Sequence, residues 1–243
     1  TKPVVWVTLS KATTHITEPL RPDGYVDYLA AINQMASQGV TPENNAAIPL
    51  LHIIKAKSFS PGHRKKIADM LGVPELPEEN ECLEILDDYC KLHPESAIPQ
   101  DQTEEQSAGK RKRKPVIRSG DLARKQLYIA MSRPWSPNEF PMLAAWLDAN
   151  EEPLTWVVEA SKRTRWFVPM PPPYESPSLL ASFPPMFTET VSAGQMLIAR
   201  AMLRVEQGDN ERAWQDLLAC HRLARLVVQG PIFIDAISGF ALN

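Results

Sequence analysis

The stretch VEQGDNERAWQDLLACHRLARLVVQG, residues 205–230, decides the fold class. At Gly208-Asp209 a glycine ends one helix and an aspartate caps the next. The helix before this turn has an apolar stripe of Gly194, Leu197, Ile198, Ala201, Met202 and Val205. The helix after it has a stripe of Trp214, Leu217, Leu218, His221, Ala224 and Val228. The pattern predicts two antiparallel helices, with His221 in the middle of a buried stripe.

The same hairpin resembles a tetratricopeptide unit at several positions, namely Ala201, the Gly-Asp turn, Ala213, Leu217 and Cys220. It departs from that pattern at Arg200 and Arg204, where a leucine and an aromatic residue are expected. No second copy follows at the repeat length of about 34 residues. A generic helical hairpin is therefore favoured over a repeat array.

Helical periodicity extends over most of the remaining chain. It predicts helices from an Asp23 N-cap to Gly39, over 41–54 with a kink at Pro49, and then over 60–72, 79–92, 119–132, 140–147, from Pro153 to Ser161, and after Pro231. Strand-like runs are confined to 4–9 and 165–168. We expect an all-α fold of helical hairpins in an orthogonal or superhelical array, with at most one or two short strands.

The distribution of charge and proline divides the chain. Residues 1–95 are predicted to form an N-terminal helical lobe, 96–118 a charged linker or disordered loop, and 119–243 a C-terminal helical lobe. Within the last, 164–186 contains seven prolines and is expected to lie across the helices as an extended strap.

Composition excludes several classes of function. The chain has 243 residues, 44% of them hydrophobic, which is enough for a core, and its net charge of -3 gives no overall attraction to nucleic acid. Three cysteines without a CxxC pair favour free thiols, which are more usual in a reducing compartment. The motifs GxSxG, GxxxxGK[ST], HExxH and GxGxxG and an EF-hand loop are absent, and we expect no cofactor and no metal. No run of residues is long and apolar enough to span a membrane.

Three polar residues are weak candidates for a binding site. His221 lies on an apolar stripe, where a histidine usually bonds a carbonyl, and the adjacent Cys220 points about 100° away from it on a helix. Asn44 and Asn45 belong to the turn TPENN, where they are expected to satisfy the first turn of a helix. A zinc site built from Cys90, His93, Cys220 and His221 would require the two lobes to meet.

Two charged runs are interpreted as solvated surface. Lys110 to Lys114 could contact phosphates, but no aromatic residues adjoin this run to stack on bases. The acidic residues between Glu78 and Asp88 are expected to form the exposed face of a helix.

Four stretches carry a family resemblance: TEPLRPDGYVDYLAAIN, GVTPENNAAIPLL, RPWSPNEFPMLAAWLDANEEPL and ARAMLRVEQGDNERAWQDLLACHRLARLVVQGP. Together they resemble a family of uncharacterised proteins from planctomycete bacteria. The resemblance implies a hydrophobic N-terminal anchor ahead of TEPLRPDG, and hence a membrane-tethered, extracytoplasmic domain. Free thiols are less usual in that compartment than in a reducing one. It implies no activity. The start at Thr1 and the apolar end SGFALN are those expected of a fragment.

These observations favour a non-catalytic helical protein-interaction or structural domain whose partner is a protein. The competing hypothesis is a hydrolase-like enzyme with a cleft between the lobes near His221 or the TPENN turn. A third hypothesis is weak nucleic-acid binding through Lys110 to Lys114. The membrane is expected as a partner only through the anchor, and the sequence leaves the oligomeric state open.

Overall fold

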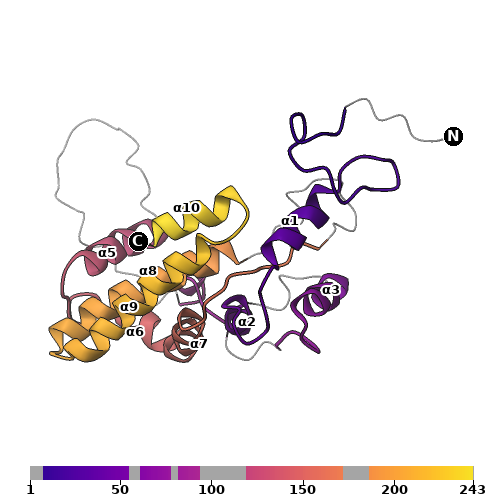
Figure 1. Ribbon diagram of the computed structural model, residues 1–243. Helices are drawn as coiled ribbons and strands as arrows, with labels where there is room; N and C mark the ends of the chain where they lie inside the picture. Colours follow the sequence, from indigo (N-terminus) through magenta and orange to yellow (C-terminus); the bar gives the residue numbers. More distant parts are fainter. Residues whose placement is uncertain (1–7, 55–60, 78–81, 94–118, 172–185, 243) are drawn as a thin grey trace, which may run out of the picture.

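The fold is built around the hairpin of residues 205–230. The computed structural model describes residues 8–54, 61–77, 82–93, 119–171 and 186–242 (Figure 1). These residues form the helices α1 (Tyr28–Ala36), α2 (Ala47–Leu50), α3 (Pro61–Leu71), α4 (Leu86–Leu92), α5 (Ser119–Ser132), α6 (Pro141–Ala149), α7 (Glu151–Ser161), α8 (Phe187–Glu206), α9 (Asn210–Val227) and α10 (Phe233–Ala241), and a 3-10 turn, Leu51–Ile53. Among the described residues there are isolated bridges at Leu20–Val26 and Asn45–Arg165 but no strand, and the all-α class is confirmed.

The turn between α8 and α9 forms as predicted. Gly208 has a φ of +79°, which a side chain would disfavour, and the Asp209 side chain accepts a hydrogen bond from the Arg212 backbone N–H. Small residues line the buried faces of both helices, including Gly194, Ala201 and Ala213. Because these side chains are short, the two long helices can pack closely.

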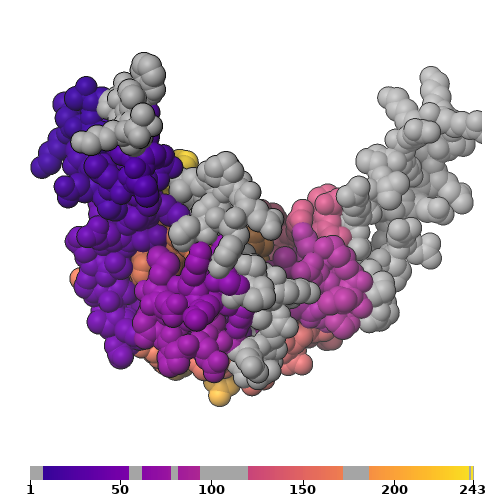
Figure 2. Space-filling view, turned by 90° about the vertical axis from the view of Figure 1, so that its right-hand side faces the viewer, coloured from indigo at the N-terminus to yellow at the C-terminus, as the bar shows by residue number. Residues whose placement is uncertain are grey.

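The other C-terminal helices surround this pair. α5 packs against α8, α7 packs against α9, and α10 lies on both α9 and α8 (Figure 1). α2 packs on α7, and α4 packs on α5. A continuous core results, with Trp135, Trp146 and Leu197 among its largest fully buried side chains. In Figure 2, α3 and α4 form the near face, and the C-terminal helices lie behind them.

Three N-terminal predictions need correction. α1 is capped by Asp27, not Asp23, because Asp23 accepts a hydrogen bond from the Tyr25 backbone N–H within the preceding turn. α2 begins only at Ala47, so Pro49 falls in its first turn, where no intrahelical bond is lost and no kink arises. α4 begins at Leu86, and within the predicted 79–92 helix the described residues 82–85 are not helical.

An extended segment, residues 164–171, follows α7 and binds α1 and the residues just before α2 through hydrogen bonds. The Arg165 carbonyl accepts a hydrogen bond from the Ala46 backbone N–H at 2.9 Å. The Asn33 side chain bonds both backbone groups of Met170, with its amide donating to the carbonyl at 2.8 Å and its oxygen accepting from the N–H at 2.9 Å. These residues are the described start of the predicted strap, and 172–185 lie outside the described residues.

Candidate functional site

His221 lies on the exposed face of α9, not in the core. The predicted stripe is therefore wrong, since Trp214 is 60% and Val228 43% exposed. The buried face of α9 instead comprises Ala213, Asp216, Ala219, Cys220, Leu223, Ala224, Leu226 and Val227. α9 therefore has two apolar sides. The side that includes Ala213, Ala219 and Cys220, which are smaller residues, packs against α8, and the side that includes Trp214 does not. His221 lines neither of the two hollows described below.

The buried face of α9 includes a carboxylate because an arginine on α8 meets it. Asp216 receives two hydrogen bonds from Arg200, at 3.0 and 2.7 Å, and one from Arg204 at 2.6 Å. Glu151 at the start of α7 pairs with the same two arginines, at 2.6 and 3.3 Å. Burial lowers the pKa of Arg200, but the hydrogen bonds and charge of Asp216 outweigh this effect and the net pKa is raised. These charges join three helices.

Asn44 and Asn45 both bind backbone. The Asn44 side chain accepts from the Thr41 N–H at 2.8 Å and donates to the Gly39 carbonyl at 3.0 Å, which closes the TPENN turn. Asn45 is fully buried and bonds both backbone groups of Phe167, at 2.8 and 3.0 Å. Its oxygen also accepts from the Ala47 N–H at 3.1 Å, near the start of α2. The described contacts of both side chains therefore hold the fold together.

The outer face of α10 carries a cluster of apolar side chains that sequence reasoning missed. Phe233 is 81%, Phe240 73% and Ile237 44% exposed. They lie at spacings of four and three residues, and so share one side of the helix. We call these three side chains the α10 outer face. They are exposed even though α10 packs on both α8 and α9.

The opposite side of α10 contacts the core through small residues. A side chain at Gly239 would lie 2.8 Å from the Ala224 carbonyl oxygen, so only glycine permits this approach to α9. Ser238 and Leu242 are also buried, and Ser238 donates to the Ile234 carbonyl within the helix. The small residues of α10 therefore point inward, and its large aromatic residues point outward. The sequence signal is the segment FIDAISGF, which alternates bulky and small residues at helical spacing.

A small pocket of about 70 Å³ lies beside α10, and none of the three outer-face residues lines it. Its lining is mainly apolar and comes from the extended segment, the start of α8, the α9–α10 turn and α10: Trp166, Val168, Met170, Met186, Phe187, Thr190, Val227, Pro231, Ile232, Ile234, Asp235 and Ser238. Burial raises the pKa of the Asp235 carboxyl to about 6, although a hydrogen bond from the Ile232 backbone N–H opposes the shift. A pocket of this size and polarity suits an aliphatic side chain better than a charged ligand.

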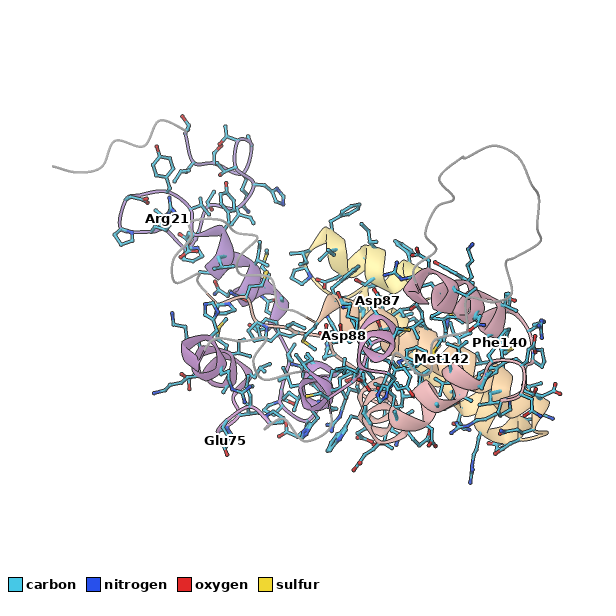
Figure 3. The ribbon with its side chains drawn as sticks, turned by 180° about the vertical axis from the view of Figure 1, so that it is seen from behind. Arg21, Glu75, Asp87, Asp88, Phe140 and Met142 are labelled. Atoms are coloured by element: carbon cyan, nitrogen blue, oxygen red, sulfur yellow. The ribbon has the colours of Figure 1, made fainter. Side chains whose placement is uncertain are left out.

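A second hollow, of about 350 Å³, lies between α4, α5 and α8. Asp87 and Arg124 line it and form an ion pair with each other. Figure 3 shows Asp87 and Asp88 on α4, in front of the C-terminal helices. Tyr128, Ser192 and Gln195 add polar groups. Because its charges already pair, the hollow presents little net field to a charged ligand.

The remaining candidates are not assembled in the part of the chain that the structure describes. There, no three His, Cys, Asp or Glu side chains gather as a metal site would require. Lys110 to Lys114 lie outside the described residues. None of the described helices has the length and apolar character needed to cross a membrane. No family model, curated protein or solved structure matches the chain.

Proposed function

We propose that this chain is a non-catalytic protein-interaction domain and that the α10 outer face is its docking surface. The observation that carries the proposal is the exposure of Phe233 and Phe240, at 81% and 73%, on a helix that is otherwise anchored in the core. Contiguous exposed apolar side chains of this kind mark interaction sites in soluble proteins. Exposed aromatic residues are also the side chains that contribute most to binding energy when a partner buries them.

The neighbouring pocket adds specificity to this surface. Phe187 and Ile234 line this pocket and are 40% and 37% exposed. Their exposed parts extend the apolar area beyond the α10 outer face. A partner that covers the α10 outer face and also extends past Ile234 can place one aliphatic side chain in the pocket of about 70 Å³. The surface therefore fits an apolar partner better than a polar one.

Site-specific photo-crosslinking tests this proposal. We would install p-benzoylphenylalanine at position 240 of the full-length protein and irradiate the cells that produce it. Trp214 is the matched control position, because it is an exposed aromatic residue on the neighbouring helix α9. We expect adducts of discrete mass from position 240 that are absent from position 214. Equal adducts from both positions, or none from position 240, would contradict the proposal.

A further inference from the structure

We propose that the partner on the α10 outer face is α10 of a second copy of this chain, packed antiparallel about a two-fold axis near Ile237. This inference rests on the proposed function. It adds the identity of the partner and the symmetry of the contact.

The positions of the three exposed side chains suit a two-fold contact. Phe233 and Phe240 are seven residues apart, or about 10 Å along the helix axis, and Ile237 lies between them. An antiparallel copy centred near Ile237 therefore brings Phe233 of one chain against Phe240 of the other, and the reverse pair forms by symmetry. Such self-complementary contact is the rule for two-fold dimers. The paired rings also gain from edge-to-face or offset stacking.

The exposed apolar area is large enough for a weak dimer. The exposed fractions of the two phenylalanines and Ile237 correspond to roughly 400 Å² per chain. Phe187, Val228 and Ile234 are each about two-fifths exposed and add a rim of roughly 200 Å² per chain. The sum over two chains is roughly 1,200 Å², the lower end of the range for specific interfaces. Interfaces at this end of the range are typical of weak, transient association, so we expect a dimer that dissociates at micromolar concentrations of chain.

The charge pattern of α10 does not oppose contact between two copies. Asp235 is the only charged residue of the helix, and it faces the pocket, away from the α10 outer face. Two identical faces can therefore meet without placing like charges opposite each other, which would disfavour a symmetric pair. A partner of different sequence would gain no electrostatic advantage on this face.

Sedimentation velocity over about 1 to 200 µM chain tests the inference. We expect the wild type to shift from monomer to dimer in this range, and Phe240→Glu to weaken association by about 30-fold or more, because it places a charge in the paired face. Trp214→Glu is the matched control and should associate like the wild type. Circular dichroism checks that all three chains are equally folded. A wild type that stays monomeric throughout, or a dimer that Phe240→Glu does not weaken, would overturn the inference.

Cysteine crosslinking tests the position of the axis. With Cys82 and Cys90 replaced by serine, Ile237→Cys should form a disulfide-linked dimer under mild oxidation, and Trp214→Cys should not. Equal crosslinking of the two variants would overturn the two-fold arrangement. A monomeric chain that still gives photo-crosslinks to another protein from position 240 refutes the second copy as partner and leaves the proposed function standing. Loss of both results refutes both proposals.

Discussion

Replacing Asp216 with alanine is expected to destabilise the protein strongly. The Asp216 side chain is 2% exposed and accepts three hydrogen bonds from Arg200 and Arg204. Its removal leaves the Arg200 guanidinium, 8% exposed, with Glu151 as its remaining carboxylate in the network. Breaking one side of a buried pair costs about 3–5 kcal/mol, since the other charge stays buried without compensation. This cost is at least about a fifth of the stability of a typical domain, which is about 5–15 kcal/mol.

The same network offers an internal control. Glu151 is 55% exposed, so Glu151→Gln removes a solvated partner and should cost about 1 kcal/mol or less. The double variant Arg200→Met with Asp216→Leu removes both buried charges and should recover more than half of the loss.

Urea denaturation at neutral pH, followed by circular dichroism, measures all three free energies of unfolding. An Asp216→Ala loss of about 1 kcal/mol, equal to that of Glu151→Gln, would refute the argument that burial of these charges couples the three helices.

Three further substitutions test the other contacts by the same denaturation measurement. Asn45→Ala leaves both backbone groups of Phe167 without their side-chain partner and should cost about 2–3 kcal/mol; a loss below about 0.5 kcal/mol would contradict this role. Gly239→Val forces α10 away from the Ala224 carbonyl and should cost about 1–3 kcal/mol, with faster hydrogen exchange in α10; unchanged exchange would count against the close approach. Burial raises the pKa of the Asp235 carboxyl to about 6, whereas in the unfolded chain it titrates near pH 4. Between these two pH values the native state holds a proton that the unfolded state has released. The free energy of unfolding of the wild type therefore falls as the pH rises from about 4 to about 6. Asp235→Asn should lack that slope and be up to about 1 kcal/mol more stable than wild type at pH 7.5, after allowance for partial exposure; parallel pH profiles would refute the assignment.

Local signals predicted the helices that have strong caps and regular spacing. Proline and glycine delimit α3, and the Gly208-Asp209 pair separates α8 from α9, as the structure confirms. The bounds of α5 were also predicted, at 119–132. At these boundaries the backbone preferences of proline, glycine and an N-cap residue start or stop the helix without help from distant contacts.

Long-range contacts explain the features that periodicity did not predict. The face of α9 depends on Arg200, which makes an inward Asp216 tolerable, so an apolar count on α9 alone selects the wrong side. α2 is short because Asn45 and its neighbours bind the extended segment instead of extending the helix. The buried Asn150 similarly bonds both backbone groups of Glu84, which is 66 residues away. Partners at such separations leave no periodic signal in the sequence.

The outward side chains of α10 were equally difficult to predict. The spacing of bulky and small residues in FIDAISGF shows that α10 has a bulky side and a small side, but it does not decide which of the two faces the core. The decision comes from Gly239, whose close approach to α9 turns Phe233 and Phe240 outward. The exposure of the α10 outer face is therefore a result of tertiary packing.

Hydroxyl-radical footprinting with mass spectrometry tests the docking surface most directly, because it reports the solvent exposure of single side chains. Phe233 and Phe240 should be oxidised readily in the dilute purified chain and protected when the chain is bound to its partner. Trp214, exposed at 60%, should be oxidised in both states. Equal oxidation of Phe240 in the two states would contradict the claim that the α10 outer face binds a partner.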